Sequence, residues 1–107
     1  MASYRVEVTA EARKDLRRAP GHLRARILQV LHMLERNYSP PGSRRLDTAQ
    51  LEETLPPDMS FWRVHLDTWR VIYIVDTEDQ VVSILAIRQH PLYQYEDLRD
   101  LSQRRRP

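Results

Sequence analysis

The segment FWRVHLDTWRVIYIV, Phe61–Val75, decides the fold of this chain. On each side of Asp67-Thr68, apolar or aromatic residues alternate with other residues, as in two strands of a sheet that is buried on one face. If Asp67-Thr68 is a two-residue hairpin turn, His65 lies directly opposite Arg70. The sequence therefore predicts an antiparallel hairpin whose register is set by its turn.

The two faces of this hairpin differ in chemistry. Because side chains alternate between faces along a strand, one face is wholly apolar or aromatic: Trp62, Val64, Leu66, Trp69, Val71, Tyr73 and Val75. We expect helices to cover that face. The other face has its polar members near the turn and comprises Phe61, Arg63, His65, Arg70, Ile72 and Ile74. Like charges that face each other across strands repel, so this face is expected to receive an anionic ligand.

A third strand is predicted over Val81–Arg88, after the turn DTEDQ. Running antiparallel to the second strand, it returns to the place where that strand begins, so we expect Arg88 beside Arg70. Pro91 favours an extended conformation at His90, which would direct His90 to the same side as Arg88. One exposed corner of the sheet is thus predicted to gather Arg63, His65, Arg70, Arg88 and His90.

The first half of the chain predicts a strand followed by two helices. Tyr4–Val8 alternates like a strand, and Thr9 can cap a helix over AEARKDLRRA. A second helix, up to about Asn37, is predicted from apolar residues at spacings of three and four: Leu23, Ile27, Val30, Leu31 and Leu34. The predicted fold class is α+β, with an N-terminal strand, a helical hairpin and an antiparallel three-strand meander covered by helices on one face.

Three further segments lie outside this framework. NYSPPGSRRL is predicted to be a loop at the sheet edge, where Arg44 and Arg45 can reach a backbone phosphate. The acidic stretch 47–60 is predicted to hold one or two helical turns, because Asp47 and Gln50 have the spacing of a capping box. The C-terminal segment is predicted to be a short helix or an irregular tail.

The composition is that of one small domain over residues 1–107. The chain has 107 residues, 41% of them hydrophobic and 30% charged, which leaves room for a single core. It has no cysteine, which excludes a disulfide framework and a thiol nucleophile, and its scattered histidines predict no metal site. VIYIV is far too short to span a bilayer, and the first residues carry charges where a signal peptide needs an apolar core. We therefore expect a cytoplasmic protein without membrane contact and without a cofactor.

The predicted cluster of arginine and histidine has the residue types that cleave RNA without a metal ion. Guanidinium groups hold a phosphate and stabilise the charge that develops on its oxygens in the transition state. A histidine titrates near neutral pH and can pass a proton to a leaving oxygen. RNA supplies its own nucleophile, the 2′-hydroxyl group. All but one of the 17 basic residues are arginine, the exception being Lys14, but composition alone does not assign them a role.

The order of these segments resembles the RelE/ParE superfamily of toxins from bacterial toxin–antitoxin modules. ARKDLRRAP, the amphipathic helix, PPGSRRL and WRVHL…WRVIYIVD…VVSILAIRQH follow the layout of that family over roughly Tyr4 to Leu98. FWRVHLDTWRVIY and the end Arg88-Gln89-His90 are most similar to the RelE and YoeB branches. The resemblance implies a RelE-like fold and a ribosome-dependent mRNA endonuclease that inhibits translation.

The resemblance also implies roles for individual residues. Arg70 matches the family's central phosphate-binding arginine, and Arg63 and His65 fall on its two basic strand positions. His90 matches the histidine that acts as general acid in the YoeB branch. Tyr95 fits the spacing of a tyrosine found in many relatives, and we prefer it to the nearby Tyr93.

Some departures from those relatives concern catalytic positions. Pro91 stands where they have arginine, and Arg88 is the candidate replacement. The catalytic glutamate of the YoeB branch has no assigned counterpart; Glu52 and Glu53 are the nearest candidates.

A second function stays open from sequence. ParE-like toxins use the same fold to block DNA gyrase by protein–protein contact, without nuclease chemistry. The predicted arginine and histidine cluster favours the nuclease, because a gyrase-binding protein needs no general acid. Both functions imply a cognate antitoxin, and a face of basic and apolar residues suits an acidic, amphipathic segment that orders on binding.

Overall fold

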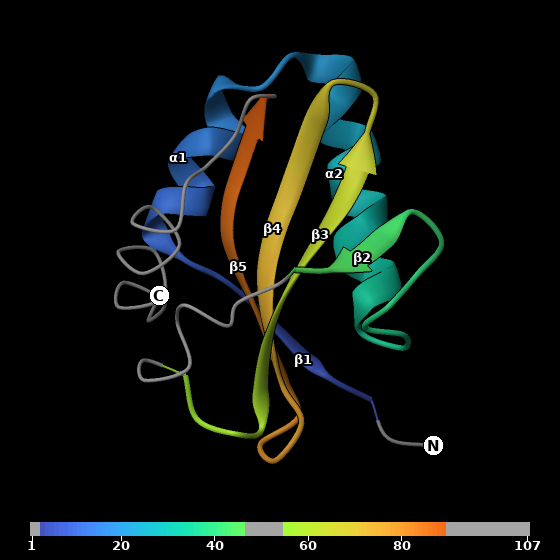
Figure 1. Cartoon of the computed structure of the whole chain (residues 1–107). Helices are drawn as coiled ribbons and strands as arrows, with labels where there is room; N and C mark the ends of the chain where they lie inside the picture. The colour runs from blue at the N-terminus through green and yellow to red at the C-terminus, as the bar shows by residue number, and fades with distance from the viewer. Residues whose placement is uncertain (1–2, 47–54, 90–107) are drawn as a thin grey trace.

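The computed structural model describes residues 3–46 and 55–89, which form two layers (Figure 1). A sheet lies in front of two helices, with α2 behind β3 and β4 and α1 beside β5. We call the face of the sheet that is turned away from the helices the front face. The elements, in chain order, are β1 (Arg5–Val8), α1 (Ala10–Arg18), α2 (Gly21–Leu34), β2 (Ser43–Arg45), β3 (Met59–Leu66), β4 (Trp69–Asp76) and β5 (Val81–Gln89).

The sheet confirms the predicted α+β architecture and extends it. Its strand order is β1-β5-β4-β3-β2, in which β3, β4 and β5 form the expected antiparallel meander. β1 pairs in parallel with β5, the last strand of the described chain, and both helices follow β1 directly. The predicted loop around PPGSRRL is corrected at Ser43–Arg45, which forms the short edge strand β2 antiparallel to β3. A three-residue strand produces no periodicity by itself; only its pairing with β3 makes it a strand.

The register of the β3–β4 hairpin is as the two-residue turn predicts. His65 pairs with Arg70, and the pairing continues down the hairpin to Met59 and Asp76. Asp67 begins the turn with φ 55, in the left-handed region that aspartate tolerates better than most residues. The turn therefore decides which side chains share a face.

The helix-side core contains the apolar face of the hairpin, as expected. Val71 and Tyr73 of β4 are fully buried there, beside the apolar stripe of α2 that includes Leu23 and Ile27. Trp62 and Trp69 pack against the same core and stay partly exposed. The prediction that helices cover this face is confirmed.

Helix α1 packs against the part of β5 that does not pair with β1. Thr9 caps the helix by accepting a hydrogen bond from the Ala12 amide at 3.2 Å, and its hydroxyl donates to the Ile84 carbonyl at 2.8 Å. Further along, an Asp15 carboxylate oxygen accepts a hydrogen bond from the Ile87 amide at 2.9 Å. A side chain of α1 thus satisfies a backbone group at the edge of the sheet, where a neighbouring strand would otherwise do so.

The middle of the front face forms a second, smaller core. Phe61, Ile72 and Ala86 are fully buried, and Ile74 and Leu85 are nearly so. Partly buried residues pack against them, namely Leu46, Leu55 and Met59. The alternation alone suggests that the front face exposes a continuous row of apolar side chains. The row is not exposed, because Leu46, Leu55 and Met59 help to cover it.

Candidate functional site

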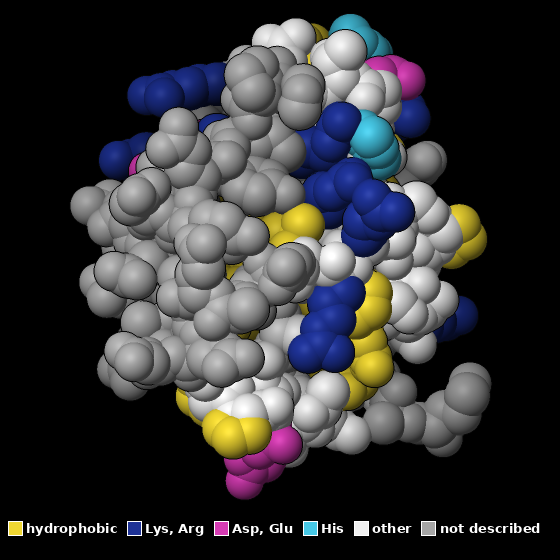
Figure 2. Space-filling view, viewed as in Figure 1, with side chains coloured by type: hydrophobic (Ala, Val, Ile, Leu, Met, Phe, Trp, Pro, Cys, Tyr) yellow, Lys and Arg dark blue, Asp and Glu magenta, His cyan; other side chains and the backbone are white. Residues whose placement is uncertain are grey.

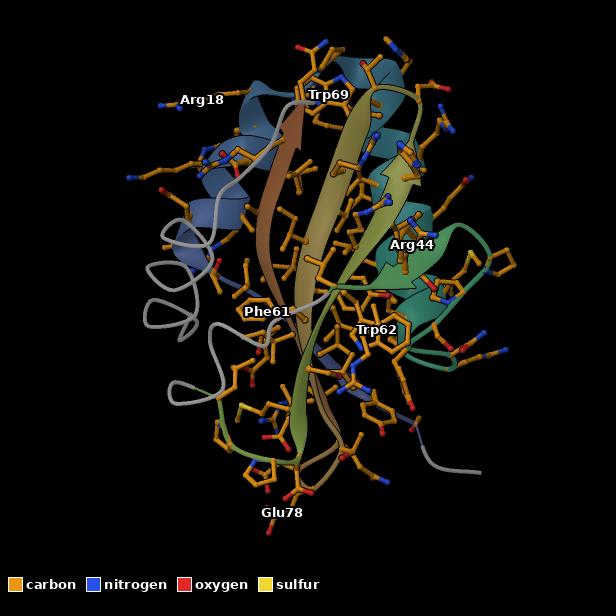
Figure 3. The ribbon with its side chains drawn as sticks, viewed as in Figure 1. Arg18, Arg44, Phe61, Trp62, Trp69 and Glu78 are labelled. Atoms are coloured by element: carbon orange, nitrogen blue, oxygen red, sulfur yellow. The ribbon has the colours of Figure 1, made fainter. Side chains whose placement is uncertain are left out.

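The basic corner consists of Arg44, Arg63, His65 and Arg70, at the end of the front face nearest the β3–β4 turn. Arg63 pairs with Arg44 across β2 and β3, and His65 pairs with Arg70 across β3 and β4. Directly paired residues point to the same face of a sheet. In Figure 2, basic and histidine side chains form a band over this part of the sheet, and Figure 3 shows Arg44 beside β3.

Within the basic corner, β3 contributes two neighbouring basic side chains. Arg63 Nη1 lies 3.5 Å from His65 Nδ1, which brings the guanidinium and imidazole groups together on one strand. Arg63 is half-buried and His65 is exposed. A group that can exchange a proton thus lies beside one that can hold a phosphate.

Arg70 is oriented by the backbone of its own turn. Its Nη1 donates to the carbonyl oxygens of Asp67 and Trp69, both at 3.1 Å. The side chain is half-buried, so the surrounding structure also limits its motion. An arginine held in this way loses less conformational entropy when it binds an anion than one that moves freely in solvent.

Arg88 lies opposite Arg70, as predicted, but its guanidinium is directed to α1. Its Nε lies 3.3 Å from an Asp15 carboxylate oxygen, and its Nη2 lies 3.7 Å from a Glu11 carboxylate oxygen. Two carboxylates therefore compensate the charge of Arg88. Its assignment to phosphate binding stays a prediction, and these ion pairs favour a structural role for it.

The predicted pair Arg44 and Arg45 is divided between the two faces. Arg45 pairs with Trp62 and so lies on the helix-side face, whereas Arg44 joins the basic corner. Alternation along β2 separates them, an effect that could not be anticipated while this segment was interpreted as a loop. Of the two arginines, only Arg44 lies at the basic corner.

His90 and Tyr95 lie outside the described residues, as do the predicted helical turns that begin at Asp47 and the C-terminal segment. These predictions are therefore not tested by the positions of the described residues. Their roles continue to rest on the resemblance described above.

An ion pair at the rim of the basic corner was not predicted. Arg26 Nη1 of α2 lies 2.6 Å from an Asp67 carboxylate oxygen of the β3–β4 turn. The two residues are 41 positions apart in the sequence. Helical periodicity places Arg26 on an outer face of its helix, and no local signal connects it to the turn.

Acidic residues gather at the opposite end of the front face, around the β4–β5 turn: Asp58, Asp76, Glu78 and Asp79. Figure 3 shows Glu78 at that end, and Figure 2 shows acidic side chains there, far from the basic band. A hydrogen bond with Asp58, and then the negative charges nearby, raise the pKa of Glu78. The front face therefore has a positive and a negative end, and an anion is attracted to the basic corner.

The Tyr73 hydroxyl is excluded from the site by burial. It donates a hydrogen bond to the Tyr38 carbonyl at 2.7 Å, which ties the segment after α2 to the sheet. Burial raises the pKa of Tyr73 well above its ordinary value, so it stays protonated. Its role is structural.

A family model extends over most of the chain. The model that describes the ParE toxin of the type II toxin–antitoxin system parDE matches residues 6–91. The chain belongs to this family. It is a toxin of a type II toxin–antitoxin system, and the predicted superfamily is confirmed.

Solved structures with the same fold include RelE toxins and their complexes. The archaeal RelE–RelB complex from Pyrococcus horikoshii is matched with 27% identity and a TM-score of 0.69, over 81% of this chain and 94% of that one. The complex RelBE2 from Mycobacterium tuberculosis has 22% identity and a TM-score of 0.64, over 82% and 99% of the two chains. The isolated RelE toxin from E. coli has 17% identity and a TM-score of 0.60, over 95% and 98%.

These structures confirm the RelE-like fold that the sequence predicts. No curated protein matches the sequence. Among the described residues, no helix is long and apolar enough to cross a membrane.

Proposed function

We propose that this toxin is a metal-independent endoribonuclease that cuts mRNA on the ribosome and so inhibits translation. The observation that carries the proposal is the basic corner, in which three arginines and a histidine from three neighbouring strands share one face. Gathering these charges has an electrostatic cost that an anionic ligand offsets. An RNA phosphodiester, with its neighbouring 2′-hydroxyl group, suits this set, because the arginines can bind its phosphate and the histidine can transfer a proton.

In the proposed reaction, Arg70 and Arg63 bind the scissile phosphate, and Arg44 binds the RNA backbone at the edge of the sheet. The 2′-hydroxyl gives its proton to a base, for which His65 beside Arg63 is the candidate among the described residues. The 2′ oxygen attacks phosphorus and the bond to the 5′ oxygen breaks, so the upstream fragment ends in a 2′,3′-cyclic phosphate and the downstream fragment begins with a 5′-hydroxyl group. The leaving 5′ oxygen takes a proton from a general acid, the role that the resemblance assigns to His90. Arg70 stabilises the charge that builds on the phosphate oxygens during this step.

Translation extracts test this proposal directly. Mapping of mRNA ends after addition of the wild-type toxin is expected to show cuts within translated codons, and far fewer with His90→Gln. Cleavage should need ribosomes, which supply the translated mRNA. Intact mRNA in the presence of active toxin would contradict the nuclease.

A second candidate function is supported by the family match. The matching model is that of ParE toxins, whose RelE/ParE superfamily also contains gyrase inhibitors that act by protein–protein contact. In that case the wild-type toxin leaves mRNA intact, and covalent gyrase–DNA complexes accumulate in treated cells. The same extract and cell experiments therefore separate the two functions.

Both functions include a cognate antitoxin as partner. The Pyrococcus and Mycobacterium structures are toxin–antitoxin complexes, which supports such a partner for this chain. We propose that an acidic, amphipathic segment of the antitoxin binds the basic corner and the apolar surface beside it. Expression of the toxin alone should arrest growth, and co-expression of a small acidic antitoxin should restore it. The nuclease function places the protein in the cytoplasm, with the ribosome.

A further inference from the structure

We propose that Arg26 is a positioning residue for the basic corner: it holds the Asp67 carboxylate away from Arg70, so that an anionic substrate does not compete with the protein's own carboxylate. The inference rests on the proposed function, because it assigns to Arg70 an RNA phosphate as ligand. It concerns a residue of α2 that touches neither the substrate nor the reacting atoms.

The β3–β4 turn brings an acidic side chain close to the principal arginine of the site. Asp67 and Arg70 are three residues apart, and Arg70 Nη1 already donates to the Asp67 carbonyl oxygen at 3.1 Å. The Asp67 side chain is 71% exposed, so little packing restrains it. A carboxylate tethered this close is an intramolecular competitor at high effective concentration. Carboxylate and phosphate both fit the guanidinium fork.

Arg26 removes this competitor by pairing with it. Its Nη1 lies 2.6 Å from Asp67 Oδ2, a short charge-assisted contact. The helix that carries Arg26 is fixed from its other side, where Leu23 and Ile27 are buried in the core. The arginine therefore approaches the turn from a rigid element, on the helix side of the corner, while Arg70 lies on the front face.

The ion pair contributes little to the stability of the fold, so its effect on RNA binding can be measured without a change in folding. The two side chains are 44% and 71% exposed, and pairs of this kind are screened by solvent and salt. A substitution at Arg26 should therefore leave the fold intact. The substitution instead releases the Asp67 carboxylate, which can then pair with Arg70. Removal of the Asp67 charge should therefore cancel the effect of the Arg26 substitution on RNA binding.

The experiment is a suppression test, in which a second substitution should cancel the effect of the first. Arg26→Gln, Asp67→Asn and the double variant are compared with Arg24→Gln, which removes an exposed arginine from the same helix. Asparagine tolerates the left-handed conformation of residue 67 and keeps the turn. The measurements are anisotropy of a short fluorescein-labelled single-stranded RNA, and kcat and KM for mRNA cleavage on ribosomes.

Arg26→Gln is expected to weaken RNA binding about three- to tenfold and to raise KM with kcat unchanged, since the released carboxylate competes only for binding. Asp67→Asn should bind RNA at least as tightly as the wild type. The double variant should match Asp67→Asn, and Arg24→Gln should change affinity less than about twofold. Arg26→Lys, which keeps the charge, should behave like the wild type.

Two results would overturn the inference. One is equal weakening by Arg26→Gln and Arg24→Gln, which would show a general loss of positive charge. The other is a double variant as weak as Arg26→Gln, which would show that Arg26 acts without Asp67. An Arg70→Ala arm separates this failure from failure of the proposed function: if RNA binding does not depend on Arg70, both are wrong. Thermal unfolding of every variant identifies loss of folding.

Discussion

The two hairpin turns of the meander lie at opposite ends of one sheet, beside side chains of opposite charge. The β3–β4 turn lies beside the basic corner, and the β4–β5 turn lies beside Asp76, Glu78 and Asp79. Both ends belong to the same strands, so strand pairing alone does not distinguish them. The comparison shows that the candidate site of this toxin is localised by the side chains beside one turn, and not by the strand pairing.

The two ends also respond differently to crowding of like charges. At the acidic end, a carboxyl group can take up a proton, and the raised pKa of Glu78 is the sign of that response. At the basic end, arginine cannot release its proton at any ordinary pH. Repulsion between guanidinium groups is therefore relieved by anionic groups, which supports the proposal that RNA binds at this end.

The largest expected effect is that of Arg70→Ala. Loss of a group that stabilises transition-state charge lowers kcat by roughly 10²–10³. The assay is mRNA cleavage on ribosomes under single-turnover conditions. Arg5→Ala is the matched control, because Arg5 lies on β1 in the row of Val81 and Asp76, at the acidic end. Equal losses from both variants would show that the basic corner has no special role.

The next effect concerns stability at the edge of β5. Asp15→Ala removes the acceptor for the Ile87 amide and the closer partner of Arg88, so the free energy of unfolding should fall by about 1.5–3 kcal/mol. Chemical denaturation measures this change. Glu11→Ala removes only the 3.7 Å contact of Arg88 and should cost less than about 1 kcal/mol. A catalytic loss without a stability loss in Asp15→Ala would instead place Arg88 in the active site.

The two arginines of β2 give a sharper comparison within one strand. Arg44→Ala should weaken RNA binding about three- to tenfold, because it removes the phosphate contact proposed for the Arg44 side chain at the basic corner. Arg45→Ala removes the same charge from the opposite face and should change affinity less than about twofold. Anisotropy titrations at two salt concentrations measure both. If the two variants are equally weak, RNA contacts both faces of β2, and the corner is larger than the four residues assigned to it.

The smallest effect is at the acidic end. Because the pKa of Glu78 is raised above its ordinary value of 4.5, the folded state binds more protons than the unfolded state between the two values. Proton binding by Glu78 therefore stabilises the folded state at low pH. This stabilisation is lost as the pH rises through the folded pKa of Glu78, where the carboxyl group becomes charged beside other carboxylates. Glu78→Gln should raise the unfolding midpoint at neutral pH and lose that advantage below pH 4.5. RNA cleavage should not change.

Much of the fold follows from short-range pattern. The alternation around Asp67-Thr68 predicts the hairpin register and the residues that face the helices, because a two-residue turn leaves no other pairing. The spacing of Leu23, Ile27 and Leu34 predicts the buried stripe of α2 in the same way. These predictions hold because each depends on one repeating geometry within one segment.

The candidate site is predicted only in part, because some of its contacts follow from strand pairing and others join distant segments of the chain. The pairing of His65 with Arg70 and of Arg88 with Arg70 follows from the meander, so the sequence by itself determined that basic residues meet at one end of the sheet.

The tertiary structure alone decided which of those charges are compensated and which share a face. Arg88 turns to the carboxylates of α1, Arg26 holds Asp67, and Arg44 is separated from Arg45 by the pairing of β2 with β3. Each of these contacts joins segments that are distant in the chain. Their geometry depends on how whole elements pack, which no local pattern of residues specifies.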